Sequence, residues 1–104
     1  MAEKTVVCKR SDVPGGGMKV VEVGDKRISI CDVEGTLYAI EDICTHDDGP
    51  LGDGALRGDQ VECSRHGARF DVKTGAAVQM PAIVPVKTFP VSVEGDDVLL
   101  EGLQ

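Results

Sequence analysis

Apolar and polar residues alternate along most of the chain, and turn residues interrupt the alternation at short intervals. Within 27–33, for example, Ile28 and Ile30 face one side while Ser29 and Cys31 face the other. A period of two is typical of strands rather than helices. The pattern predicts strands over 5–9, 19–23, 27–33, 37–41, 55–57, 60–62, 69–72, 76–79, 87–94 and 98–101.

The connections between these segments predict an antiparallel arrangement. The turn at 24–26 is a hairpin signal, and 11–17 is expected to be a loop. Its three glycines precede no Gly-Lys-Ser/Thr ending, so they indicate a flexible connection rather than a phosphate-binding loop. Pro90 marks 87–94 as an edge or irregular strand. We therefore predict an all-β fold, an antiparallel β-sandwich forming one domain over 1–104, with a small β subdomain inserted at about 42–82.

Candidate chemistry is concentrated in two short stretches inside that insertion. Cys44-Thr45-His46 comes first, and Cys63-Ser64-Arg65-His66 follows after residues 47–62. The chain has only two histidines, and both lie in this pattern. Two thiolates and two imidazoles satisfy either a tetrahedral zinc ion or a two-iron cluster. The joint pattern therefore predicts a metal centre.

The order of the donors favours iron over zinc. Zinc fingers usually pair two cysteines and then two histidines, whereas each stretch here carries one of each. A two-iron cluster can use this mixed order, because one iron takes the thiolates and the other takes the imidazoles. A structural zinc module stays open as an alternative. A papain-like Cys/His pair lacks the other sequence features of that class.

These stretches resemble the Rieske family, whose signature is Cys-X-His followed by Cys-X-X-His. The likeness covers at least residues 40–90 and includes Gly67, Phe70, Asp71, Thr74-Gly75 and Met80-Pro81-Ala82. It implies one [2Fe-2S] cluster, with Cys44 and Cys63 on the inner iron and His46 and His66 on the outer iron. Ser64 stands where many members have proline, which removes no ligand.

Three further features concern the surroundings of such a cluster. Leu51 is the only large apolar residue of the turn-rich segment 47–54, so it is expected either to shield the cluster or to pack as an ordinary loop residue. Gly67 is expected to fold the backbone tightly and direct its amide inward. The segment 80–86, with Pro81 and Pro85, resembles the third loop that covers the cluster in this family.

Four positions depart from the pattern of high-potential Rieske proteins. Those members have a disulfide at the positions of Gly49 and Arg65, a serine at Ala68 and a tyrosine at Phe70. The serine and tyrosine hydroxyls are hydrogen-bond donors that raise the potential. Their absence implies a low potential, similar to that of ferredoxins of bacterial multicomponent oxygenases.

The resemblance implies a one-electron carrier that is not itself an enzyme and has no small-molecule substrate. Its expected partners are a flavoprotein reductase and a terminal oxygenase, docking transiently near His46 and His66. No histidine is left to build the mononuclear iron site of an oxygenase. A small Rieske-like subunit of an assimilatory nitrite reductase is the alternative. A redox or iron sensor would need an output domain that the sequence does not resemble.

The formal net charge of −7 argues against nucleic acid or an anionic membrane as partner. Asp47, Asp48 and Asp53 either steer a basic partner or are simply solvated. No apolar run has the length of a membrane span, so a soluble, cytoplasmic protein is expected. Cys8 and Cys31 lie in strand patterns and are expected to be free buried thiols, with a disulfide between them as the alternative.

Overall fold

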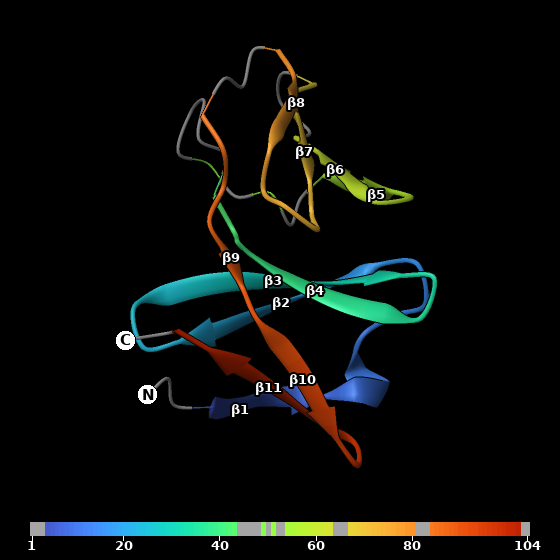
Figure 1. Cartoon of the computed structure of the whole chain (residues 1–104), viewed down its shortest axis with the longest axis vertical. Helices are drawn as coiled ribbons and strands as arrows, with labels where there is room; N and C mark the ends of the chain where they lie inside the picture. Colours follow the sequence, from blue (N-terminus) through green and yellow to red (C-terminus); the bar gives the residue numbers. More distant parts are fainter. Residues whose placement is uncertain are drawn as a thin grey trace.

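The computed structural model describes residues 4–43, 49, 51, 54–63, 67–80 and 84–102. Its strands form three antiparallel sheets that follow one another along the long axis (Figure 1). The lower sheet has the order β1-β11-β10, the middle sheet β2-β3-β4-β9 and the upper sheet β5-β6-β7-β8. The prediction of an all-β antiparallel fold is confirmed. The described ranges contain no helix with the length and hydrophobicity to cross a bilayer.

The strands of each sheet have the following bounds. The lower sheet contains β1 (Lys4–Lys9), β10 (Val91–Glu94) and β11 (Asp97–Glu101). The middle sheet contains β2 (Met18–Val23), β3 (Lys26–Val33), β4 (Thr36–Glu41) and β9 (Thr88–Phe89). The upper sheet contains β5 (Ala55–Arg57), β6 (Gln60–Glu62), β7 (Arg69–Asp71) and β8 (Ala77–Gln79). The upper sheet is inserted between β4 and β9. The chain therefore leaves the lower and middle sheets, which together form the base of the molecule, and then returns to them.

The middle sheet separates two hydrophobic cores. Ile28 and Ile30 point from β3 into the lower core, which the lower sheet covers. Cys31 and Val33 point from the opposite face into the upper core, below the upper sheet. The predicted alternation along β3 is confirmed. Its consequence is that one strand stabilises both the base and the inserted sheet, because each buried aliphatic side chain contributes about 1.5–3 kcal/mol.

Cys8 and Cys31 are free thiols on opposite sides of this sheet. Cys31 is fully buried in the upper core, while Cys8 is half-buried at the edge of the lower core. Burial, and next the negative charge of Asp42, raise the pKa of the Cys31 thiol to about 12. The prediction of free thiols is confirmed for both cysteines and that of burial for Cys31 alone, and the alternative of a disulfide between the two is wrong.

The segment 87–94 differs from the single strand that its pattern predicts. Pro90 divides it, and the two parts pair in different sheets: β9 with β4, and β10 with β11. The physical reason is that proline lacks the N–H that a continuous ladder needs at this position. Phe89 lies in the lower core and Val91 packs against it, but Val93 is 44% exposed, so the three do not share one buried face.

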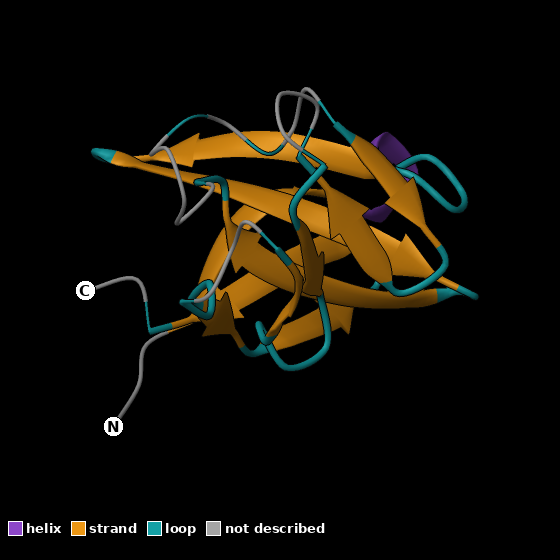
Figure 2. Cartoon of the chain, turned by 90° about the horizontal axis from the view of Figure 1, so that it is seen from above, coloured by secondary structure: helices purple, strands orange, loops and turns teal. Residues whose placement is uncertain are grey.

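Two aspartates, Asp12 and Asp32, make polar contacts that shape the ends of β1 and β3. Arg10–Asp12 form a short 3-10 helix where a loop is expected, because the Asp12 carboxylate accepts from the Lys9 N–H at 3.1 Å (Figure 2). After β3, the Asp32 carboxylate accepts from the Gly35 N–H at 2.8 Å and from the Arg10 guanidinium at 3.0 Å. These contacts, the Gly35 amide first, lower the pKa of the Asp32 carboxyl.

Candidate metal centre

Cys63 lies directly after β6 and is almost completely buried, with 1% of its surface exposed. Its own backbone closes the loop that follows. The Cys63 N–H donates to the Ala68 carbonyl at 2.7 Å, and the Gly67 N–H donates to the Cys63 carbonyl at 3.1 Å. Gly67 has a φ of +75°, a conformation that glycine adopts without strain. The predicted tight turn is confirmed, but the Gly67 amide is bonded to the Cys63 carbonyl.

The thiol of Cys63 belongs to an apolar core. Leu51, Ala68 and Phe70 are each fully buried in the same core. A buried apolar setting excludes water from a thiolate and from any metal it binds. The two positions at which high-potential members have hydroxyl groups, Ala68 and Phe70, therefore present only carbon atoms in this core.

Close backbone contacts bring the chain on either side of β5 and β6 together. The Gly54 N–H donates to the Leu51 carbonyl at 2.9 Å. Gly54 also passes so near β6 that a Cβ on it would overlap the carbonyl oxygen of Glu62, the residue before Cys63. Only glycine fits this approach. The chain that follows the first ligand stretch is thereby held against the residue before Cys63, where the second ligand stretch begins.

The end of the predicted covering loop 80–86, called the third segment below, is anchored to the upper sheet by Gly75. The Val86 N–H donates to the Gly75 carbonyl at 2.8 Å, and the Gly75 N–H donates to the Asp71 carbonyl at 2.7 Å. On the other side of the hairpin, the Gln79 side-chain amide donates to the Gly67 carbonyl at 3.2 Å. The backbone contacts of Gly75 attach the third segment to the β7–β8 hairpin, and the Gln79 contact attaches β8 to the loop that begins at Cys63.

An ion-pair cluster stands on the solvent side of β6. The Glu62 carboxylate accepts from the Arg69 guanidinium at 3.1 and 3.2 Å and from Arg57 at 3.3 Å. The hydrogen bond from Arg69, and next that from Arg57, lower the pKa of the Glu62 carboxyl. Because these side chains are partly solvated, the cluster contributes modestly to stability. It cross-links β5, β6 and β7 beside the candidate site.

The structure places one of the four predicted ligands, Cys63. Cys44, His46 and His66 lie outside the described residues, as do Ser64, Arg65 and the aspartates 47, 48 and 53. Among the described residues, no three cysteine, histidine or carboxylate side chains gather around one metal position. The fit of the site to a metal is tested by Cys63 itself. A buried thiol that opens a tight, water-excluding loop, with an imidazole three residues later in the sequence, suits a soft metal centre.

Sequence reasoning missed the residues that hold the loops in place. Asp42, Gly54 and Gln79 contact backbone groups far along the chain, and no local pattern marks such partners. The sequence indicates Gly75 as a turn residue and as part of the Rieske resemblance, and the structure adds the reason why a side chain is not accommodated there.

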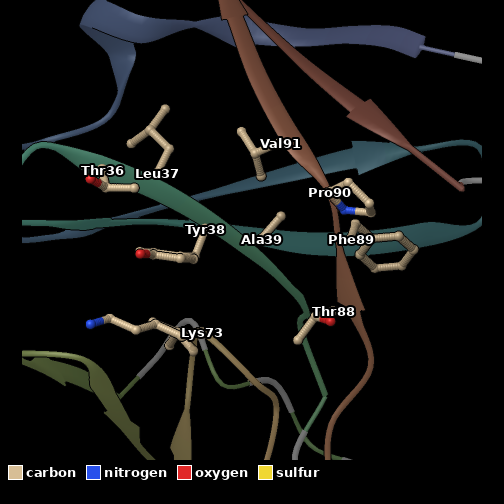
Figure 3. Close-up of a pocket in the computed structure, with 10 residues that line it drawn as sticks. Thr36, Leu37, Tyr38, Ala39, Lys73, Thr88, Phe89, Pro90 and Val91 are labelled. Carbon is tan, nitrogen blue, oxygen red and sulfur yellow. The ribbon is translucent and has the colours of Figure 1, made fainter.

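A separate hollow lies between the base and the upper sheet (Figure 3). It has a volume of about 390 Å³ and is lined by β4, β9, the start of β10 and the turn after β7. Lys73 and Tyr38 both line the hollow, and the Lys73 ammonium lies 6.0 Å from the centre of the Tyr38 ring. Among the residues that the structure describes, the lining of this hollow does not include the predicted ligand Cys63.

Comparison with known proteins defines the class of this fold and site. Residues 3–90 match the Rieske [2Fe-2S] domain, so the chain belongs to the Rieske family. Its cofactor is accordingly a Rieske-type [2Fe-2S] cluster, and the zinc alternative is set aside.

The relatives narrow the class to ferredoxins. The chain is 44% identical over 97 residues to the ferredoxin component of biphenyl 2,3-dioxygenase from Rhodococcus jostii (strain RHA1), covering 93% of this chain and 91% of that protein. It is 41% identical over 90 residues to the ferredoxin component of the naphthalene 1,2-dioxygenase/salicylate 5-hydroxylase systems from Ralstonia sp., covering 86% of each.

Among solved structures, the Sphingomonas yanoikuyae B1 ferredoxin superposes with a TM-score of 0.91 at 32% identity, covering 96% of this chain and 99% of that chain. A chain from the complex of reduced oxygenase and oxidized ferredoxin in carbazole 1,9a-dioxygenase gives 0.88 at 37% identity, covering 95% of this chain and 93% of that chain. The protein is therefore an electron-transfer component rather than a catalytic subunit.

Proposed function

We propose that this chain is a ferredoxin that passes single electrons from a flavoprotein reductase to a terminal oxygenase, in a bacterial multicomponent system. Cys44 and Cys63 hold the inner iron of the cluster, and His46 and His66 hold the outer iron. The observation that carries the proposal is the burial of Cys63 at the start of a backbone-closed loop whose next residues lead to His66. When bound, the cluster supplies reversible one-electron chemistry.

The remaining residues of the site keep the cofactor protected and its potential low. Leu51 and Phe70 fill the core beside Cys63 and exclude water from it. Ala68 and Phe70 provide no hydroxyl that would stabilise added negative charge on the cofactor. Segment 42–82 serves as the cluster-binding subdomain of a single domain.

The docking surface for the oxygenase lies at the end of the molecule that carries the upper sheet. Val78, Met80 and Val84 are 46%, 75% and 53% exposed, and β8 stands at the top of Figure 1. The same hairpin is bonded to the second loop through Gln79. Exposed apolar side chains beside a redox site suit a small, transient interface, because they bind without a large desolvation cost. We place the protein in the cytoplasm, where reducing conditions keep Cys8 and Cys31 as thiols.

Absorption and EPR spectra before and after dithionite, with iron and acid-labile sulfide content, test this function. We expect two irons and two sulfides per chain and a Rieske-type signal only after reduction. Cys63→Ser should abolish the signal, while Cys8→Ser, at a half-buried free thiol beside the lower core, should leave it unchanged. Electron transfer from a reductase to an oxygenase should depend on the reduced protein. A colourless wild-type protein that contains zinc alone would overturn the proposal.

A further inference from the structure

Asp42 is a buried carboxylate at the junction between the base and the inserted sheet, where β4 ends and the chain rises (Figure 1). Its side chain has no exposed surface. One carboxylate oxygen accepts from the Ser29 hydroxyl and from the Leu51 N–H, each at 3.0 Å. The other accepts from the Arg27 guanidinium at 3.2 Å. The Asp42 N–H in turn donates to the Arg27 carbonyl at 2.8 Å.

These contacts join the two ends of the first ligand loop. Asp42 and Leu51 stand on either side of the segment that contains Cys44 and His46 in the sequence. The segment is rich in turn residues, so its ends need an anchor other than a strand ladder. Asp42 supplies it by bonding Leu51 on one side and β3, through Ser29 and Arg27, on the other.

Leu51 connects this anchor to the second ligand loop. Its side chain is fully buried in the core that contains Cys63, Ala68 and Phe70. Its carbonyl accepts from Gly54, which is pressed against the residue before Cys63. A shift of the Leu51 backbone would therefore alter the separation between the two loops.

A charged side chain at the buried position of Asp42 indicates a role other than packing. Removing a carboxylate from water is costly unless several donors satisfy it, and an apolar residue of similar volume would stabilise the base equally well. Among the described residues, two donors on β3 and a third at Leu51 instead specify one arrangement of the junction.

We propose that Asp42 is a positioning residue of the cluster site: through the Leu51 amide it holds the first ligand loop at a fixed place relative to Cys63. The inference rests on the proposed function, since it takes Cys44 and His46 to be ligands. Asp42 acts through Leu51 and the backbone and is not itself a ligand.

The test compares Asp42→Asn with Asp32→Asn in the intact, cluster-loaded protein. Asp32 is a matched control, because Asp32 and Asp42 are each 5% exposed as whole residues, and Asp32 also accepts from an arginine and from a backbone N–H. Its network, however, lies at the turn between β3 and β4. Both substitutions keep the shape of the side chain and remove the charge.

We expect Asp42→Asn to lose its cluster to a chelator about fivefold faster than wild type, the effect of weakening about one hydrogen bond. Its reduced EPR signal should broaden or shift in g-value, and the Leu51 amide should exchange hydrogen faster. Asp32→Asn should unfold at a lower temperature yet keep the wild-type EPR signal, cluster lifetime and Leu51 exchange.

Wild-type spectra and Leu51 exchange in Asp42→Asn would overturn the inference, and so would equal changes in both variants. If Asp42→Asn does not fold, Ser29→Ala and Arg27→Gln each remove one donor and should give smaller changes of the same kind; wild-type behaviour in both would overturn it. A wild-type protein without a two-iron signal refutes the proposed function and this inference together. A normal wild-type signal with an unaffected Asp42→Asn refutes the inference alone.

Discussion

The carbonyl oxygen of Val86 occupies the place where a side chain on Gly75 would begin. Gly75 also has a φ of +82°, which other L-residues rarely adopt, and its carbonyl accepts from the Val86 N–H at 2.8 Å. This contact joins the third segment to the turn of the β7–β8 hairpin. The position of the segment over the upper sheet thus depends on the absence of one methyl group.

Gly75→Ala should therefore destabilise the protein by at least about 4 kcal/mol, because overlap with backbone adds to the cost of the positive φ. Gly58→Ala is the matched control. Gly58 also has a positive φ, +64°, but a Cβ there meets open space, so the loss should be only about 1–2 kcal/mol. Denaturant unfolding of both variants checks this. Equal losses would show that the approach of Val86 is unimportant.

Ala68→Ser and Phe70→Tyr should each raise the midpoint potential. Both positions are fully buried in the core of Cys63, so an added hydroxyl has few partners other than the cofactor and its thiolate. A hydrogen bond that is about 1 kcal/mol stronger in the reduced state raises a one-electron potential by about 40 mV. Redox titration followed by EPR or circular dichroism measures the change. An unchanged or lowered potential in both variants would remove this explanation of the low potential.

Stability should fall in acid partly through Asp32. Its carboxyl has a pKa below the ordinary value of 3.8, because the Gly35 amide and Arg10 favour the charged form. A lowered folded-state pKa means that the stabilisation is complete above the ordinary value and is lost as the pH falls through the folded value. Asp32→Asn should thus cost about 1.5–3 kcal/mol at pH 7 and progressively less below pH 4.

Unfolding free energies of Asp32→Asn at pH 7 and pH 3 check this dependence. Asp25→Asn, at an exposed aspartate in the β2–β3 turn, should change stability by less than about 0.5 kcal/mol at both values. A cost of Asp32→Asn that does not shrink in acid would contradict the assignment.

Val78→Ser should weaken electron delivery to the oxygenase without altering the cluster. Burying this side chain in an interface contributes about 1 kcal/mol, so the ferredoxin concentration at half-maximal rate should rise about fivefold. Val93→Ser is the control, because Val93 is exposed to nearly the same extent, 44% against 46%, but lies on β10 in the lower sheet. Steady-state assays with the oxygenase, with EPR to confirm an intact cluster, distinguish the two. Equal effects would place the docking surface elsewhere.

Local patterns in the sequence are sufficient to predict the period of the strands and the type of metal chemistry. Alternation along 27–33 is a property of neighbouring residues, so the two faces of β3 were predicted correctly. The pairing of one cysteine with one histidine in each stretch is likewise local; it favours a two-iron cluster over zinc, and the family match shows a Rieske [2Fe-2S] domain.

Tertiary structure alone decided how these parts are joined. Pro90 signals a break, but only long-range pairing assigns β9 to the middle sheet and β10 to the lower one. Asp42 looks like the polar end of a strand, yet its partners Ser29 and Leu51 come from other segments. Such contacts depend on which segments, distant in the sequence, meet after folding. A local sequence pattern does not specify these long-range contacts.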